Sequence, residues 1–276
     1  MQQKAETETK QLEVKFIDDI HDENHRPHHI YHCTCNMTDS VCLAKENSHH
    51  EGEKLQFYHQ SPLDLILPKF YGIYVSLGLP YMIIEDLDAG FKSPCHCDIK
   101  LGTRQWEIGA SDGFRVKLIR KNEISISRFL GIRLVSILIQ RNKKIILDTS
   151  KSQNCYISKE QFIQQMRDFI PPPHLLSFIQ QLIKINCVFS SFIEANPGFR
   201  IYASSLFMSY DGDDLSKEPR LGLIDFAHSH FDIRTEGYDI NDANLDDGVE
   251  LGLRNLLEIV KSFVPDPNAT DYHTYF

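Results

Sequence analysis

The segment that most constrains the fold of this 276-residue chain is an apolar run, PYMIIEDL (80–87), which contains two acidic residues near its end. Short strand-like runs precede it, and longer strands and helices follow it. Residues 85–93 therefore form a candidate linker between a small strand-rich part and a larger α+β part, and a cleft between two such lobes is a common ligand site. We expect a polar, partly disordered N-terminal extension (1–26), an N-lobe (27–87), a C-lobe (88–264) and a flexible tail (265–276).

Local patterns predict the elements of both lobes. In the N-lobe, strand-like runs cover 41–45 and 73–75, and a helix begins at Glu53. In the C-lobe, a triple proline at 171–173 separates two helices, the first of which starts from a capping box, Ser158–Gln161. The remaining C-lobe predictions are a hairpin of 128–139 with 143–148, strands at 199–208 and 221–226, and a closing amphipathic helix at 248–263.

The charge is unevenly placed along the chain. The whole sequence carries 29 basic and 38 acidic residues, a net charge of −9. Residues 100–144, however, hold eleven basic and three acidic side chains, a net charge of +8, which leaves −17 for the rest. Either the protein has two solvated faces of opposite sign, or a basic surface for a compact polyanion lies beside acids that hold metal ions. The average charge argues against nucleic acid and anionic membranes as partners, and no uninterrupted apolar run approaches the roughly 18 residues of a membrane span.

The seven cysteines show no disulfide-framework spacing, so we interpret them as reduced thiols of an intracellular protein, in the cytoplasm, the nucleus or both. The polar N-terminus lacks the apolar core of a secretory signal. The segment HRPHHIYHCTC (25–35) holds four histidines and two cysteines, which raises the alternative of a zinc site. Its spacing differs from the usual CxxC or HxxxH pairs, so a strand with its flanking turn is the favoured interpretation.

One segment, PCHCDIKLG (94–102), combines a carboxylate with a lysine two residues later. In an extended strand these side chains, Asp98 and Lys100, point to the same face and address one site. Gly102 lets the backbone approach a ligand closely. A D-x-K pair alone is weak evidence, because such pairs are frequent on strand surfaces.

A second segment, LGLIDFAH (221–228), ends an apolar strand with Asp225. A strand-end aspartate is a usual position for a magnesium ligand that faces a triphosphate, although it also commonly caps a turn. The hydroxyls of Ser204 and Ser205 lie on the preceding predicted strand. If the two strands form a hairpin, these hydroxyls reach the same metal ion or a phosphate.

Together and in this order, the segments resemble the inositol polyphosphate kinase family, whose hallmarks are P-x-x-x-D-x-K-x-G, an S-S-L-L-like strand and an I-D-F strand end. This chain reads PCHCDIKLG, SSLF and IDFAH, with Phe207 where the family usually has leucine. The resemblance runs from about Val41 to Phe263. It implies an α+β, two-lobed, protein-kinase-like fold with an ATP cleft between the lobes, and a kinase that uses ATP and Mg²⁺.

The resemblance also implies roles for single residues. Asp98, Lys100 and Asp225 would be catalytic: Asp98 faces the nucleotide, Lys100 contacts the transferred phosphoryl group and substrate phosphates, and Asp225 binds magnesium with help from Ser204. The implied ATP contacts are Lys45, Glu85, Leu87, Asp98 and Ser204. The family usually has its N-lobe lysine at the position of Leu43, so Lys45 either replaces it on the same strand face or is displaced by a bulge.

The substrate is implied by the segment near 103–125. GTRQ (102–105) resembles the inositol hexakisphosphate kinase branch, which favours a diphosphoinositol product. Lys117 and Lys121, four residues apart, share a helix face that suits ring phosphates. Arg104, Lys100 and His228 complete the implied substrate contacts, whereas a solvated basic helix is the plain alternative.

Two other functions stay open at this point. The multikinase branch, which acts on inositol trisphosphate and tetrakisphosphate, shares every hallmark. A non-catalytic inositol-phosphate-binding protein is disfavoured, because Asp98, Lys100 and Asp225 are all present. We expect a monomer whose partner is a soluble inositol polyphosphate, with neither nucleic acid nor membrane as a partner.

Overall fold

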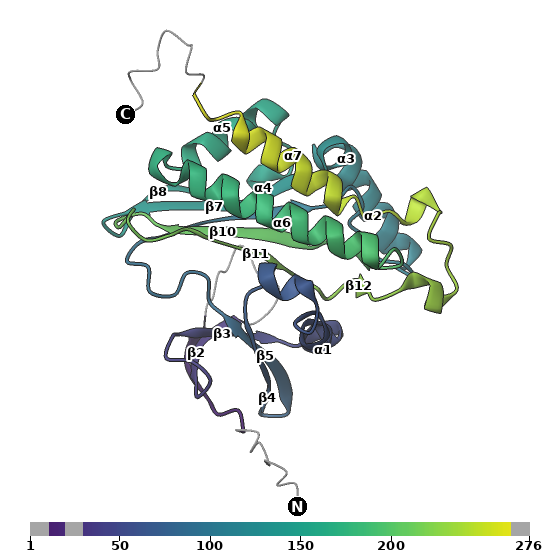
Figure 1. Cartoon of the computed structure of the whole chain (residues 1–276), viewed down its shortest axis with the longest axis horizontal. Helices are drawn as coiled ribbons and strands as arrows, with labels where there is room; N and C mark the ends of the chain where they lie inside the picture. The colour runs from purple at the N-terminus through teal and green to yellow at the C-terminus, as the bar shows by residue number, and fades with distance from the viewer. Residues whose placement is uncertain (1–10, 20–29, 266–276) are drawn as a thin grey trace, which may run out of the picture.

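The computed structural model describes residues 11–19 and 30–265, which form two lobes, each built around a five-stranded antiparallel sheet (Figure 1). The N-lobe sheet has the order β1-β2-β3-β5-β4, with strands β1 (Val14–Asp19), β2 (Ile30–Cys35), β3 (Cys42–Glu46), β4 (Phe70–Ser76) and β5 (Leu79–Glu85). The C-lobe sheet has the order β11-β10-β6-β7-β8, with strands β6 (Pro94–Leu101), β7 (Ile132–Arg141), β8 (Lys144–Thr149), β10 (Ser205–Asp211) and β11 (Arg220–Ile224). The predicted two-lobed α+β fold is confirmed.

Helices and short 3₁₀ turns complete both lobes. The N-lobe has α1 (Glu51–Tyr58), preceded by η1 (Ser48–His50) and followed by η2 (Pro62–Ile66). The C-lobe helices are α2 (Asp112–Glu123), α3 (Ser127–Leu130), α4 (Lys151–Asn154), α5 (Lys159–Phe169), α6 (Leu175–Ala195) and α7 (Val249–Lys261). A small sheet pairs β9 (Arg200–Ile201) with β12 (Ser229–His230), and η3 (Pro172–His174), η4 (Ile233–Glu236) and η5 (Ala243–Leu245) lie in the connections.

The N-lobe begins earlier than the boundary at residue 27 that we predicted. β1 pairs with β2 at the edge of the N-lobe sheet. Its Phe16 packs edge-on against Tyr31 and Tyr81, with ring centroids 5.4 Å apart in both pairs. Edge-to-face aromatic contacts of this kind add to the hydrophobic gain of burial, so β1 (Val14–Asp19) belongs to the N-lobe and packs against its core.

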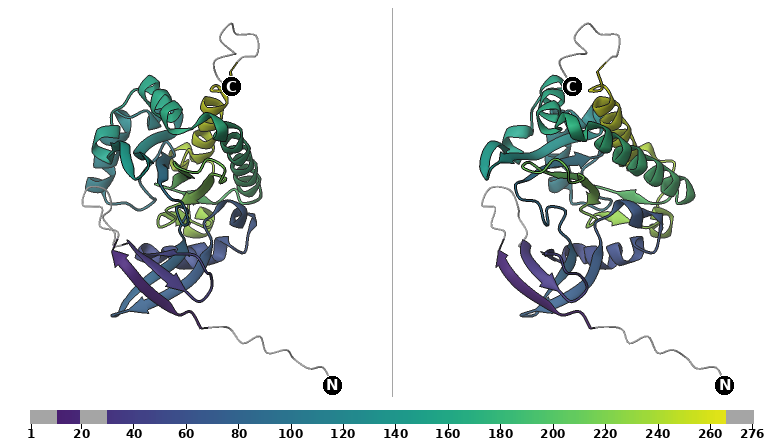
Figure 2. Two further views of the ribbon diagram at one scale, coloured as in Figure 1. Left: turned by 90° about the vertical axis from the view of Figure 1, so that its left-hand side faces the viewer. Right: turned by 60° about the vertical axis from the view of Figure 1, so that its left-hand side comes forward.

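Helices cover only one face of the C-lobe sheet. Figures 1 and 2 show α5, α6 and α7 on the face turned away from the N-lobe, which leaves the other face toward the cleft. In β6, Cys95, Cys97, Ile99 and Leu101 are buried and alternate with partly exposed residues. The alternation of a pleated strand therefore places Asp98 and Lys100 together on the cleft side, as their spacing predicts.

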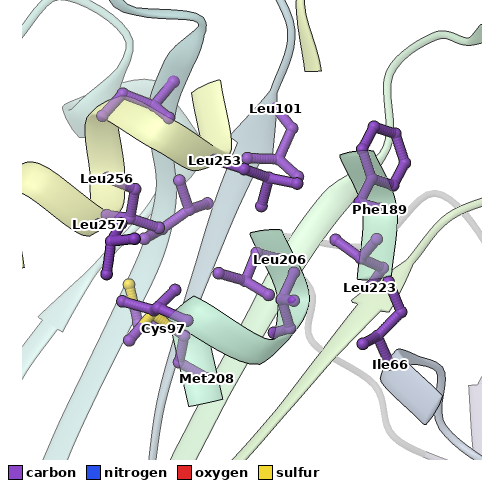
Figure 3. Packing of buried hydrophobic residues seen from close by; sticks show 14 of the residues in the cluster. Ile66, Cys97, Leu101, Phe189, Leu206, Met208, Leu223, Leu253, Leu256 and Leu257 are labelled. Carbon is purple, nitrogen blue, oxygen red and sulfur yellow. The ribbon is translucent and has the colours of Figure 1, made fainter. Parts of the chain in front are cut away.

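The C-lobe core lies between the sheet and these helices. Figure 3 shows Leu253, Leu256 and Leu257 of α7 directed at Cys97, Leu101, Leu206 and Met208 of the central strands. Ile66 of η2 belongs to the same buried cluster and lies near Leu223 and Phe189. Because η2 packs into the C-lobe core, the segment after α1 is anchored to both lobes.

The two helices around the triple proline form as predicted. Ser158 caps α5, accepting a hydrogen bond from Gln161 N–H, while the Gln161 side chain accepts one from Ser158 N–H. Within the described residues, Pro172–Ala195 is the one helical stretch long and apolar enough to cross a membrane by length and composition. Its buried residues, among them Phe178, Leu182 and Phe189, are part of the C-lobe core.

Two strand predictions were wrong in detail. The strand expected from Arg128 begins at Ile132, because Ser127–Leu130 form α3, which ends in a left-handed Gly131 (φ 63°). The strand expected over 199–208 is broken at Ala203, whose φ of 56° takes the chain out of extended conformation. The break at Ala203 serves the site, because the Ala203 carbonyl accepts a hydrogen bond from Lys100. The left-handed Gly131 instead packs closely against Gly248 and Gly252 at the start of α7.

The histidine- and cysteine-rich segment is only partly described, since residues 25–29 lie outside the described ranges. Ile30–Cys35 forms β2, as the strand interpretation predicts. Cys33 and Cys35 are buried in the N-lobe core with Cys42 of β3. All seven cysteines are free thiols.

Candidate active site

Asp225 lies at the centre of the cleft, directly after β11, with an Nζ–O contact to a lysine of each lobe. Lys45 Nζ is 2.9 Å from its Oδ1 and Lys100 Nζ is 3.2 Å from its Oδ2. The Asp225 backbone adopts a left-handed conformation (φ 66°), which is costly for a residue with a Cβ. Such strained residues occur where surrounding contacts hold them in place for a function. The contact also shows that Lys45, two residues beyond the usual family position, still points into the cleft.

Glu51, the first residue of α1, holds this arrangement together. It is buried, and its carboxylate accepts a hydrogen bond from Lys45 Nζ (3.1 Å) and from Phe226 N–H (2.9 Å). Burial alone would lower the pKa of Lys45, but the carboxylates of Asp225 and Glu51 raise it well above its usual range. Burial alone would raise the pKa of Asp225, but Lys45 and Lys100 lower it strongly. Lys45 and Asp225 therefore favour their charged forms. The sequence interpretation missed Glu51 because a helix-start glutamate is common.

Lys100 is positioned by the break in the strand before β10. Its Nζ donates a 2.7 Å hydrogen bond to the carbonyl oxygen of Ala203, the residue with positive φ. Asp98 lies two residues earlier on the same cleft face and is half-buried. The predicted catalytic residues Asp98, Lys100 and Asp225 therefore lie on one side of the C-lobe sheet.

The donor set around Asp225 fits a divalent cation. Ser204 and Ser205 are buried, and neither hydroxyl has a hydrogen-bond partner among the described residues. Ser205 pairs with Ile224, the neighbour of Asp225, across the β10–β11 ladder. A carboxylate beside unsatisfied hydroxyls is the hard-oxygen environment that Mg²⁺ prefers, and each Asp225 oxygen has capacity for a ligand beyond its lysine.

The linker between the lobes has one backbone donor suited to a nucleotide base. Glu85 N–H donates to the Lys69 carbonyl (2.8 Å), and the Leu87 carbonyl accepts from Arg220 (3.2 Å). Within the described residues, Leu87 N–H has no acceptor. A buried N–H without a partner is costly, so a ligand acceptor at this point would satisfy it.

A cavity of about 150 Å³ opens beside Lys100 and is lined by four cationic side chains, Lys100, Lys121, Arg133 and Lys151. Of these, Lys121, Arg133 and Lys151 form no ion pair with a described carboxylate, and Nη1 of the buried Arg133 has no hydrogen-bond partner there. Arg133 and Lys151 were not predicted, because a buried arginine on β7 and a lysine at the start of α4 have no local signal. We call this cavity, with its four cationic side chains, the cation cavity.

The cations of this cavity destabilise one another. Burial lowers the pKa of Lys121, and the neighbouring charge of Arg133 lowers it further. Burial also lowers the pKa of Lys151, with Lys121, Lys100 and Arg133 adding to the effect. The Asp98 carboxylate offsets part of this effect at Arg133 and Lys151, and positive groups held this close are stabilised further when a polyanion binds.

Two predicted substrate residues do not line the cavity. Lys117 is exposed, because α2 turns Phe114, Leu118 and Lys121 toward the cavity instead. Arg104 is buried against the Tyr202 ring, with its guanidinium carbon 4.7 Å from the centroid, and donates to the carbonyl oxygens of Trp106 and Asn244. Lys121 lines the cavity as the prediction requires, whereas Arg104 braces the loop that follows β6.

Gly102 also differs from its expected use. A Cβ at this residue (φ 95°) would lie 2.5 Å from the carbonyl oxygen of Asp247. That same carbonyl accepts hydrogen bonds from Thr103 N–H (2.9 Å) and Arg104 N–H (3.3 Å). The glycine therefore serves close packing of this loop against Asp247, which fixes the segment between β6 and α2.

His228 stands at the mouth of the cation cavity. It lines the cavity, and its Nδ1 is 2.9 Å from a carboxylate oxygen of Glu107. The segment that carries it, after Asp225, is joined to α1 by hydrogen bonds from Lys54 to the Ala227 carbonyl and from Tyr58 to Ser229. The predicted substrate residue His228 is thus held beside Lys100 and Lys121.

The chain is similar to known proteins in both sequence and fold. Residues 81–261, more than half of the chain, match the family model of inositol polyphosphate kinase. The chain belongs to the inositol polyphosphate kinase family. The matched range covers β5, the linker and the C-lobe elements that carry Asp98, Lys100 and Asp225.

Curated relatives of this inositol polyphosphate kinase family member are distant. An uncharacterized inositol polyphosphate kinase of Schizosaccharomyces pombe is 30% identical over 172 residues, which are 55% of this chain and 18% of the relative. Mouse inositol hexakisphosphate kinase 3 is 26% identical over 199 residues, 66% of this chain and 50% of the relative. The chain spans half or less of the length of these relatives.

A solved structure shares the fold of this inositol polyphosphate kinase family member. The inositol phosphate multikinase of Saccharomyces cerevisiae, in complex with ADP and Mn²⁺, aligns with a TM-score of 0.61 at 22% identity. The alignment covers 77% of this chain and 96% of that one. The protein-kinase-like, two-lobed fold predicted from the motifs is therefore confirmed.

Proposed function

We propose that the chain is a kinase that transfers the γ-phosphoryl group of ATP to a soluble inositol polyphosphate, with inositol hexakisphosphate as the favoured acceptor. An acceptor phosphate oxygen attacks the γ-phosphorus, the bond to the β-phosphate oxygen breaks, and ADP leaves. The product is a diphosphoinositol phosphate. The cation cavity beside Lys100 is the observation that carries the proposal.

The nucleotide end of the proposed reaction rests on the cluster around Asp225. Lys45 and Lys100 offer two fixed positive charges to phosphate oxygens, and Leu87 N–H offers a donor to the base. Asp225 would hold Mg²⁺ with a hydroxyl of Ser204, and the metal would supply charge neutralisation on the phosphates. Phosphoryl transfer depends on such positioning and electrostatic stabilisation more than on covalent chemistry.

The proposed acceptor is inferred from the positive charge of the cation cavity. Burial lowers the pKa values of Lys121, Arg133 and Lys151, and repulsion among the cations lowers those of both lysines further. The Asp98 carboxylate offsets part of this effect at Arg133 and Lys151. A ring carrying many phosphates supplies several negative charges within the span of one small cavity. Relatives at about a quarter identity are named inositol hexakisphosphate kinases, which agrees with this acceptor.

The alternative is a multikinase that acts on inositol trisphosphate and tetrakisphosphate. The size of the cavity favours it: its volume is about 150 Å³, below the roughly 300 Å³ at the lower end of typical ligand pockets. An acceptor with fewer phosphates fits that volume with less displacement of the C-lobe side chains that line it. Both candidates use the same catalytic residues, so only the product distinguishes them.

The decisive experiment incubates the protein with Mg-ATP and, separately, inositol trisphosphate, tetrakisphosphate and hexakisphosphate. Phosphorus NMR of each product distinguishes a diphosphate from a new monoester and identifies the ring position. We expect a diphosphate signal from inositol hexakisphosphate that is absent with Asp225→Asn, which controls for a contaminating kinase. No product from any acceptor would contradict the proposal, and binding that ignores ATP and magnesium would indicate a non-catalytic binding protein.

A further inference from the structure

A second histidine, from the N-lobe, contacts His228 beside the cation cavity. The His49 ring packs on His228, with the ring centroids 5.0 Å apart and the planes at 51°. His228 belongs to the C-lobe and lines the cavity. His49 lies in the short turn between β3, which carries Lys45, and α1, which carries Glu51.

The turn that presents His49 is conformationally costly. His49 (φ 52°) and His50 (φ 56°) are consecutive non-glycine residues in the left-handed region. Asn47 braces them, since its Oδ1 accepts from Gly52 N–H (2.8 Å) and its Nδ2 donates to Glu53 (3.0 Å). A strained turn that is held by its own side chains, rather than relieved by glycine, keeps the His49 ring over the cleft.

We propose that His49 is a substrate-binding residue of the N-lobe, which together with His228 holds one phosphate of the acceptor at the mouth of the cation cavity. This inference rests on the proposed function. Protonated imidazole donates a charge-assisted hydrogen bond to a phosphate oxygen. With the ring centroids 5.0 Å apart, one phosphate beside both rings can accept a hydrogen bond from each.

The charged groups around the pair favour an anion there. His228 faces Glu107 through its Nδ1, and Lys54 of α1 reaches the neighbouring Ala227 carbonyl. Lys100 and Lys121 line the cavity beyond His228. His49 and His50 are both exposed, but the His50 ring faces Glu53 at 3.5 Å. The two neighbouring histidines therefore have different surroundings, and His49 is the one that contacts the cavity-lining His228.

A binding measurement tests this directly. Isothermal titration with inositol hexakisphosphate, without nucleotide, compares wild type, His49→Gln and the matched control His50→Gln at about pH 6 and about pH 8, either side of the imidazole pKa. We expect His49→Gln to weaken binding about tenfold at the lower pH, the scale of one charge-assisted contact, with little effect at the higher pH. His50→Gln should behave as wild type at both.

A gain-of-function variant guards against a folding defect. His49→Arg keeps a cation at all accessible pH values, so it should bind at the higher pH as tightly as wild type binds at the lower pH. Wild-type affinity in His49→Gln, or an equal loss in His50→Gln, would overturn the inference. The binding measurement does not depend on turnover. If wild type binds inositol hexakisphosphate but phosphorylates no acceptor, that result contradicts the proposed function and leaves the inference about His49 standing.

Discussion

Lys45 of the N-lobe and Asp225 of the C-lobe, 180 positions apart in the chain, lie with Nζ and Oδ1 2.9 Å apart. This pair joins the two lobes at the point where the nucleotide phosphates are proposed to bind. Glu51 contacts Lys45 and the backbone next to Asp225, so one buried carboxylate aligns both partners.

Asp225→Asn removes the charge that faces both lysines. We expect turnover to fall by at least about a hundredfold, as for loss of one electrostatic contact to a transition state. The fold should persist, because Lys45 keeps Glu51 and Lys100 keeps the Ala203 carbonyl. Steady-state kinetics and circular dichroism check the two parts, and activity close to wild type would contradict the metal-binding role.

Glu51→Gln tests positioning without removing a proposed ligand of ATP. The neutral amide in this variant attracts Lys45 less strongly than the carboxylate does. Its carbonyl oxygen can still accept the hydrogen bond from Phe226 N–H. We expect kcat to fall by about a hundredfold, the scale of an error of about 1 Å in alignment, with a smaller change in the KM for ATP. Glu53→Gln, on the same helix but exposed, is the control, and equal effects of the two variants would refute the assignment.

Comparing Lys121→Met with Lys117→Met tests whether the acceptor binds only to the side of α2 that faces the cavity. Lys121 lines the cation cavity and is repelled by Arg133, whereas Lys117 is exposed outside it. We expect Lys121→Met to raise the KM for the acceptor about tenfold and also to raise the melting temperature, because it removes a repelled charge. Lys117→Met should change neither, and an effect on the acceptor KM would restore our original substrate assignment for Lys117.

Asp247 gives the protein a specific pH dependence. Its buried carboxyl accepts hydrogen bonds from Ile201 N–H and Val249 N–H, yet burial still raises its pKa to about 6. A raised pKa means that this residue's stabilising contribution is full below its ordinary pKa of 3.8 and is lost as the pH rises through about 6. The difference amounts to about 3 kcal/mol.

Asp247→Asn removes that titration. Relative to wild type, the variant should gain melting temperature between about pH 4 and about pH 7, the window that the shifted pKa defines. Thermal unfolding of both proteins across this range measures the gain. Parallel curves at all pH values would show that Asp247 does not titrate in the folded protein.

Several features of the site could be predicted from short-range rules. The alternation of β6 places Asp98 and Lys100 on one face whatever the fold around it. Ser158 and Gln161 form their capping box within one helical turn. The family hallmarks identified the fold because their order along the chain is preserved even where overall identity is about a quarter.

Other features could not be read from local patterns. The spacing of Lys117 and Lys121 fixes a shared helix face but not the direction of α2, and the structure turns only Lys121 to the cavity. The family resemblance implied a phosphate contact for Arg104, but its guanidinium instead donates to two carbonyl oxygens in and near the loop after β6. A charge count cannot separate a cation that binds a ligand from one that binds its own backbone.

The sequence by itself determined the two lobes, the strand-borne Asp98, Lys100 and Asp225, and the family, because each depends on neighbours within a few residues or on the order of short segments. Only the tertiary structure decided which side chains share the site. Arg133, Lys151, Glu51 and His49 come from β7, α4, α1 and the turn before it. Their convergence depends on how the lobes and sheets pack, and contacts between residues so distant in the chain leave no pattern in any one segment.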